Sequence, residues 1–213
     1  MSDAFDSLQQ LIDYEFKDRS LLVSAFTHSS YVNEHKGVAN ERLEFLGDCV
    51  LNFLVGVKYY EDYRDEDEGT LSSMRASVVS KQPLATLVDE LGLTEYLRVG
   101  AGTNTAEFSD KTRSNVFEAL LGAMYLDGGL EACDRFLSRV FYGKVQPVRD
   151  YKSELQKRVG APIDYKVTDE GNGQFVAVAM IGENKFSGRG STKKAAEIDA
   201  AKSAVNALDN KDK

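Results

Sequence analysis

Hydrophobic residues recur every three to four positions through the first 145 residues or so, and this period predicts a region built of α-helices. One helix is expected over residues 5–12, and a second begins after Asp18, a residue type that favours helix N-caps. A polar stretch at 33–40 reads as a loop. Further helices are expected at 41–60, 70–79, 83–91, 115–124 and 126–141.

A different pattern begins at Tyr151, after a short segment around Pro147 that is typical of a linker. A helix at 151–159 is followed by alternating apolar and polar residues, which predict strands. Gly-Asn-Gly at 171–173 predicts a hairpin turn between the first two strands. The strands are expected at 165–168, 174–181 and 185–188, and an Ala-rich helix follows Ser191 or Thr192.

These patterns predict an α+β protein with an all-α domain at 1–146, a linker at 147–150 and an α-β-β-β-α domain at 151–213. The net charge of −8, taken alone, argues against nucleic acid as a partner. However, residues 1–150 carry 15 basic and 25 acidic side chains, whereas residues 151–213 carry 11 basic and 9 acidic ones. The acidic excess therefore belongs to the helical domain, and the whole-chain charge is a poor guide to partners.

Nothing in the sequence predicts a membrane span or a signal peptide, since no run approaches about 18 consecutive apolar residues. A cytoplasmic protein is expected. Cys49 and Cys133 lie far apart without Cys-x-x-Cys spacing, so neither a disulfide framework nor a zinc site is indicated. Both are expected to be buried as small hydrophobic residues.

The strongest candidate for a functional site is the stretch Asn-Glu-Arg-Leu-Glu-Phe-Leu-Gly-Asp at 40–48. On a helix, Glu41, Glu44 and Asp48 fall on one face, while apolar residues occupy the other sides and predict a mostly buried helix. Like charges in such a setting are costly unless a cation neutralises them, and carboxylate oxygens favour Mg²⁺ or Mn²⁺. Gly47 costs about 1 kcal/mol against Ala inside a helix, which indicates that something approaches the backbone there.

The alternative is that these acids form a solvated helix face, as charged residues at helical spacing usually do. An acid elsewhere in the chain bears on the choice between a metal site and a solvated helix face. Glu118 is the single charged residue in the apolar segment 115–124, and such a group needs a partner. Glu68 precedes a predicted helix, where the positive end of the helix would favour an acid in any protein.

Several of these stretches resemble ribonuclease III, the endonuclease specific for double-stranded RNA. Glu-Arg-Leu-Glu-Phe-Leu-Gly-Asp is similar to the family signature, and the resemblance extends over nearly the whole chain. Further matching segments are Thr-His-Ser-Ser-Tyr at 27–31, Asp-Glu-Gly-Thr-Leu-Ser-Ser-Met-Arg at 67–75, the segment from Asn115 to Gly129, and Lys-Lys-Ala-Ala-Glu at 193–197.

The resemblance implies a homodimeric, Mg²⁺-dependent enzyme, with Mn²⁺ as a possible substitute, that cuts both RNA strands and leaves 5′-phosphates and short 3′ overhangs. It implies processing of rRNA precursors and other structured RNAs, including mRNA and tRNA. Asp48 and Glu118 would be catalytic. The implied metal ligands are Glu44, Asp48, Asn115 and Glu118, with Glu41 and Glu68 as supporting acids.

Two positions depart from the family pattern. The residue three before Glu118 is usually Asp, but here it is Asn115, which brings an amide oxygen without charge and weakens the expected metal site. His28, in the Thr-His-Ser-Ser-Tyr segment, is expected to be a structural residue that makes hydrogen bonds.

Residues 151–213 resemble a double-stranded RNA-binding domain. Lys193 and Lys194 at a helix start would meet phosphates, and Gln156 would approach the RNA minor groove. The usual Gly-Pro-x-His loop is replaced by Asp-Glu-Gly-Asn-Gly-Gln, so one minor-groove contact is expected to be missing.

Asn115, this altered loop and the acidic balance also fit a protein that binds double-stranded RNA without fast cleavage. An acidic helical scaffold that binds protein is a third reading, but it leaves the acids of the predicted buried helix unexplained.

Overall fold

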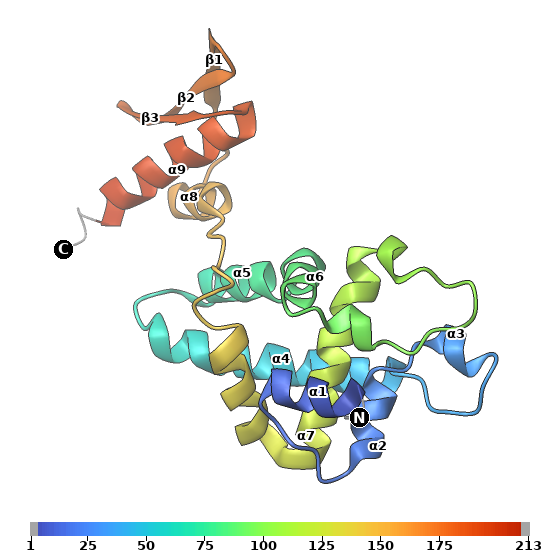
Figure 1. The fold of residues 1–213 in the computed structure, drawn as a ribbon. Coiled ribbons are helices and arrows are strands. Elements are labelled where there is room, and N and C mark those ends of the chain that lie inside the picture. Colours follow the sequence, from blue (N-terminus) through green and yellow to red (C-terminus); the bar gives the residue numbers. More distant parts are fainter. Residues whose placement is uncertain (1–3, 210–213) are drawn as a thin grey trace. The chain divides into compact units, whose positions relative to one another are not determined.

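The computed structural model describes residues 4–209 and divides the chain into two compact units, with the boundary between Val148 and Arg149. The first unit is built of helices (Figure 1). They are α1 (Ala4–Ile12), α2 (Arg19–Ala25), α3 (Ser29–Val32), α4 (Glu41–Asp62), α5 (Glu68–Val78), α6 (Lys81–Glu90) and α7 (Asp110–Val140), with the short 3-10 helices η1 (Leu93–Tyr96) and η2 (Thr105–Glu107).

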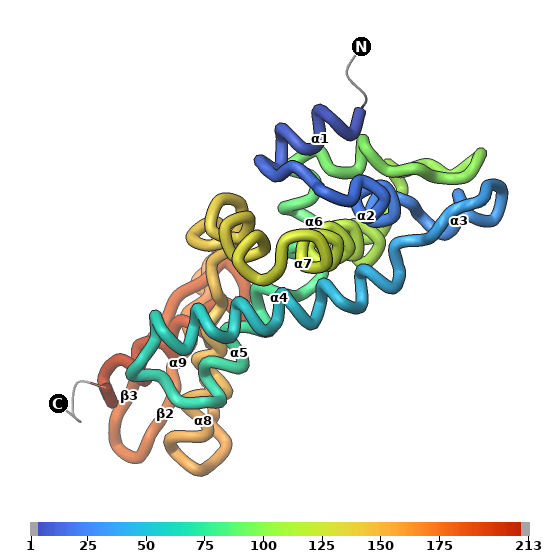
Figure 2. The backbone as a smooth tube through the Cα atoms, turned by 90° about the horizontal axis from the view of Figure 1, so that it is seen from below, coloured from blue at the N-terminus to red at the C-terminus, as the bar shows by residue number. Residues whose placement is uncertain are grey.

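Helices α4 and α7 form the centre of this unit, and Figure 2 shows α7 crossing α4. Both helices contribute fully buried side chains to one hydrophobic core, among them Leu51, Val55, Phe117 and Leu120. Each such side chain stabilises the fold by roughly 1.5–3 kcal/mol relative to an exposed one. The α4–α7 pair therefore anchors the unit.

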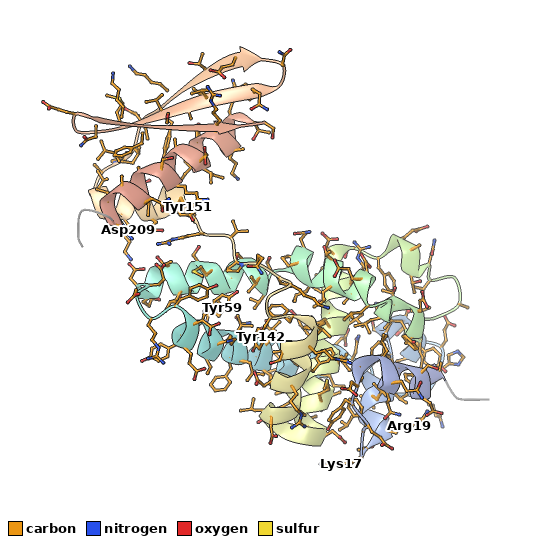
Figure 3. The ribbon with its side chains drawn as sticks, turned by 60° about the vertical axis from the view of Figure 1, so that its left-hand side comes forward. Lys17, Arg19, Tyr59, Tyr142, Tyr151 and Asp209 are labelled. Carbon is orange, nitrogen blue, oxygen red and sulfur yellow. The ribbon has the colours of Figure 1, made fainter. Side chains whose placement is uncertain are left out.

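Hydrogen bonds to one carboxylate hold the loop between α1 and α2 against α7. Asp127 of α7 accepts hydrogen bonds from the Tyr14 hydroxyl (2.7 Å) and from the backbone amides of Lys17 (3.1 Å) and Asp18 (2.8 Å); Figure 3 shows Lys17 in this loop. Immediately afterwards α7 is kinked at Gly129, whose φ of 74° is easy only for glycine. The two helices predicted at 115–124 and 126–141 are thus both present within α7, and the break between them lies at Gly129.

The second unit has the predicted order, with α8 (Tyr151–Val159), β1 (Tyr165–Gly171), β2 (Gln174–Ile181), β3 (Asn184–Gly190) and α9 (Lys193–Asp209). The strands form an antiparallel sheet in the order β1-β2-β3. Asn172 adopts φ 53° in the predicted hairpin turn, and the Thr192 side chain caps α9. Helix α9 packs on β2 and β3, and the α+β class is confirmed.

Two burial predictions are wrong. Cys133 is buried as expected, but Cys49 is exposed. Helix α4 is not covered on all its apolar sides, because Phe45 and Phe53 are 74% and 55% exposed. Periodicity marks an apolar position but does not say whether a neighbour covers it. Across residues 4–209, the structure contains no helix with the length and apolar character needed to cross a membrane.

Candidate active site

Two crossing helices bring the predicted site residues together. Helix α4 carries Glu41, Glu44 and Asp48, and α7 carries Asn115 and Glu118. Glu44 interacts electrostatically with Glu41 and Asp48, and Glu118 interacts with Asp48 and Glu44. Acids that are 74 residues apart in sequence, Glu44 and Glu118, therefore share one charged region.

The crossing is close because glycines replace side chains where the helices meet. A Cβ on Gly47 would lie 1.7 Å from the backbone carbonyl oxygen of Glu118, and a Cβ on Gly122 would lie 2.2 Å from that of Leu43. Such distances are far inside van der Waals contact, so neither position can hold a side chain as the structure stands. The predicted close approach at Gly47 is the backbone of α7.

Two of these acids, Glu118 and Glu44, have raised pKa values. Burial, and after it the charges of Asp48 and Glu44, raise the pKa of Glu118 to about 8, while Lys81 opposes the shift. Burial also raises the pKa of Glu44, with contributions from Glu41 and Asp48, whereas Lys111 lowers it. At neutral pH and without a cation, Glu118 therefore largely keeps its proton.

The acids are less buried than the helix pattern predicted. Glu41 and Asp48 are exposed, while Glu44 and Glu118 are half-buried. Burial remains the largest cause of the raised pKa of Glu118, and repulsion from Asp48 and Glu44 adds to it. The site is an open charged face rather than an enclosed acid cluster.

The donor chemistry of this face fits a hard divalent cation. Carboxylate and amide oxygens are the preferred ligands of Mg²⁺, which keeps several waters and needs few protein ligands. Among residues 4–209, no three His, Cys, Asp or Glu side chains already meet as a metal-binding group. The fit to a cation therefore rests on the chemistry of these donors and on the repulsion that a cation would relieve.

A cavity of about 410 Å³ opens beside the acids. Besides the predicted Glu41, Glu44 and Asn115, its lining includes five residues that sequence analysis did not assign to the site: His28, Ser29, Asn40, Lys111 and Thr112. One signal could have indicated Lys111, since it precedes Asn115 by four residues and so lies on the same face of α7. Nothing in the helix periodicity could have placed His28 there.

The remaining predicted residues lie elsewhere. Glu68 begins α5, where its carboxylate accepts a hydrogen bond from Ser72 (3.1 Å), and it does not line the cavity. In the second unit, Gln156 is exposed on α8 beside a hollow of about 350 Å³. Lys193 and Lys194 are exposed in the first turn of α9.

An exposed apolar stripe runs along α4 next to the acids. It consists of Phe45, Cys49, Phe53, Val57 and Tyr60, whose spacing places them on one side of the helix. Four large apolar side chains are thus between 41% and 75% exposed in a row. A continuous exposed apolar stripe of this kind marks an interaction surface.

Comparisons with known proteins agree with this organisation. The family model described as ribonuclease-III-like matches residues 18–145, and the double-stranded RNA binding motif matches residues 152–208. A protein named Ribonuclease 3 from Symbiobacterium thermophilum is 40% identical, over 92% of this chain and 91% of its own length. Ribonuclease 3 of Streptococcus thermophilus is 37% identical, over 99% of this chain and 100% of its own length.

A solved structure supports the same relationship. The nuclease domain of ribonuclease III from Campylobacter jejuni has a TM-score of 0.59 and 34% identity, and the match covers 64% of this chain and 94% of that domain. That domain has a region involved in dimer formation. With the two family matches and the near full-length relatives, these likenesses establish that the chain belongs to the ribonuclease III family of double-strand-specific endoribonucleases.

Proposed function

We propose that this chain is a Mg²⁺-dependent, homodimeric endoribonuclease that cuts both strands of duplex RNA, with Mn²⁺ as a possible substitute. Its products carry 5′-phosphates and short 3′ overhangs, and its substrates are rRNA precursors and other structured RNAs. The observation that carries the proposal is the gathering of Glu44, Asp48 and Glu118 where α4 crosses α7. There burial, and after it the neighbouring carboxylates, raise the pKa of Glu118 to about 8.

Each acid has a distinct place in this proposal. Glu44, Asp48 and Glu118 would hold the cation, with the Asn115 amide oxygen beside them. Glu41 is exposed at the start of α4 and would support the site from its rim. Glu68 would act from further away, because it lies outside the cavity.

When bound, the cation would supply positive charge to the scissile phosphate and lower the pKa of an attacking water. The chain's own residues would release a proton when the cation binds and would attract the RNA. Glu118 must lose its proton when the cation binds, because a carboxylate with a pKa of about 8 is largely protonated at neutral pH. Lys111 lies in the adjoining cavity and would attract the RNA backbone to this acidic face.

The α4 stripe is the surface that we assign to the homodimer. Burying aromatic side chains such as Phe45 and Tyr60 contributes strongly to association. The stripe borders the acid face, since Asp48 lies one helical turn after Phe45 and directly before Cys49 on α4. Dimerisation through it would place two acid sites in one assembly, one for each RNA strand.

The second unit would hold the duplex by its shape. Lys193 and Lys194 place two cations at a helix start, which suits phosphates, and Gln156 offers an amide to 2′-hydroxyls. Because A-form RNA is recognised mainly by backbone and shape, weak sequence preference is expected.

Cleavage of a long perfect RNA duplex tests the proposal, with Mg²⁺, with Mn²⁺ and with chelator. Glu118→Gln should lower the rate by on the order of 100-fold or more, since it removes a charge from the site. Glu131→Gln is the matched control, because Glu131 is an exposed acid on α7 that pairs with Arg135. Cleavage that persists in chelator, or in Glu118→Gln, would contradict the assignment.

Asn115 favours a second candidate, a protein that binds double-stranded RNA with weak or lost cleavage. An amide in place of a carboxylate gives the site one negative charge fewer, which weakens its attraction for a cation. Duplex that is retarded in a gel but left uncut under every metal would support this alternative.

A further inference from the structure

One side chain at the edge of the cavity is buried and has no partner. Asn40, the N-cap residue of α4, is 5% exposed and lines the cavity, yet its side chain makes no capping hydrogen bond. Among the described residues, the fully enclosed polar atoms without a partner belong to Arg75, Arg113 and Tyr165. The amide of Asn40 is therefore not sealed in the core, and the residue forms part of the cavity lining.

His28, the N-cap residue of α3, adds a second polar group to the cavity lining. Its Nδ1 accepts a hydrogen bond from the backbone amide of Ser30 (3.2 Å) and lies 2.8 Å from the Ser30 hydroxyl. These contacts occupy Nδ1 and leave Nε2 as the ring nitrogen that can meet a ligand. The ring packs against Phe108, with centroids 5.3 Å apart, and the His28 backbone amide donates to Arg98. The imidazole is thus held in one orientation by contacts that do not use Nε2, which has no protein partner within residues 4–209.

The two carboxylates and the one lysine of the cavity lining determine which ligand groups the cavity can accept. Glu41 and Glu44 contribute carboxylate oxygens to the lining, which repel an anion and accept hydrogen bonds from a hydroxyl. Lys111 provides one cation at the exposed edge. A lining that combines the buried Asn40, carboxylate acceptors and one peripheral cation suits a sugar hydroxyl inside and a phosphate at the rim. The volume of about 410 Å³ far exceeds the roughly 30 Å³ of one water.

We propose that this cavity receives the ribose of a nucleotide next to the scissile phosphate, and that Asn40, with His28, recognises its 2′-hydroxyl. The 2′-hydroxyl both donates and accepts hydrogen bonds, as the Asn40 amide does, and it is the group that distinguishes RNA from DNA. Asn40 is then a specificity-determining residue. This inference rests on the proposed nuclease function, because it places the sugar beside the reacting phosphate.

The test combines variants of Asn40 with substrates that lack single 2′-hydroxyls. A short RNA duplex with one cleavage site is prepared as a panel, each member with one 2′-deoxynucleotide within three positions of the scissile phosphate. Wild type, Asn40→Ala, Asn40→Ser and His28→Ala are compared by kcat/KM. Asn104→Ala is the matched control, since Asn104 is the N-cap of η2 and does not line the cavity. Serine keeps a good N-cap residue, which separates recognition from folding of α4.

At one position, the 2′-deoxy substitution should lower wild-type kcat/KM about tenfold, the size of one hydrogen bond. Asn40→Ala and Asn40→Ser should lower kcat/KM on the all-ribose duplex by about the same factor and show no further loss at that position. If the loss from the Asn40 variant and the loss from the 2′-deoxy substitution multiply at every position, the ribose assignment is wrong. It is also wrong if the Asn40 variants cancel the effect of changing a phosphate and not the effect of removing a 2′-hydroxyl.

Wild-type cleavage of the all-ribose duplex reports separately on the proposed function. If wild type does not cut, binding of the same panel to Glu118→Gln and to Glu118→Gln/Asn40→Ala decides the inference. A 2′-deoxy penalty in Kd that disappears with Asn40→Ala supports it, and equal penalties in both proteins overturn it.

Discussion

The backbone of Gly47 on α4 lies directly against the backbone of Glu118 on α7, so closely that a Cβ on Gly47 would come within 1.7 Å of the Glu118 carbonyl oxygen. The glycine that weakens α4 by about 1 kcal/mol is therefore what lets two acid-bearing helices meet. A cost in local helix stability is offset by the core that forms around the crossing. The position of Glu118 relative to Glu44 and Asp48 depends on this contact.

Gly47→Ala should destabilise the protein and impair the site together. The added methyl group cannot fit without separating α4 from α7, which costs about 1–3 kcal/mol or more. Gly56→Ala is the matched control on the same helix, because its Cβ would lie 3.8 Å or more from its nearest neighbours, atoms of Arg75. That control should gain up to about 1 kcal/mol from helix propensity. Thermal melts and duplex cleavage check both, and a Gly47→Ala protein with wild-type Tm would refute the contact.

Glu118 should make the metal-free protein less stable as pH rises. Its folded pKa of about 8 lies above the usual value of 4.5, so the folded state binds more protons between these pH values. The stabilisation is complete below about pH 4.5 and is lost as pH rises through about 8. In chelator, Glu118→Gln should therefore raise Tm at pH 8 by several degrees and change it little at pH 5. A pH-independent difference between the two proteins would exclude this titration.

Asn115→Asp should strengthen cation binding and increase cleavage. A fourth carboxylate beside Glu44, Asp48 and Glu118 adds attraction for a divalent ion, and a rise of about tenfold in Mg²⁺ affinity corresponds to 1.4 kcal/mol. Duplex binding in chelator should remain unchanged. Mg²⁺ titrations of single-turnover cleavage measure the effect, with Asn104→Asp as the control for added charge. A fall in cleavage would mean that the amide is required here.

Phe45→Asp should convert a dimer into a monomer and lower cleavage without unfolding the chain. Phe45 is 74% exposed in the α4 stripe, so charge there costs little in the monomer but much in a buried interface. Val148→Asp is the matched control, since Val148 is also exposed (68%) but lies outside the stripe. Analytical ultracentrifugation over a concentration series gives the molecular mass. A Phe45→Asp protein that remains a dimer would exclude the stripe as the interface.

Much of the molecule follows from local rules in the sequence. The three- and four-residue apolar period located the main helices, Asp18 and Thr192 cap helices as their residue types favour, and Gly-Asn-Gly forms the β1–β2 turn. These features depend on backbone conformations of neighbouring residues. They can therefore be predicted without knowledge of the rest of the chain.

The sequence by itself determined the elements, the family signature and the acids of α4, and it indicated through Gly47 that something must approach the helix. Only the tertiary structure decided what approaches it, why Phe45 and Cys49 are exposed, and that Asn40 and His28 line one cavity with Glu44. The physical reason is that periodicity gives the direction of a side chain from its own helix. What that side chain meets depends on segments distant in sequence, which only packing brings together.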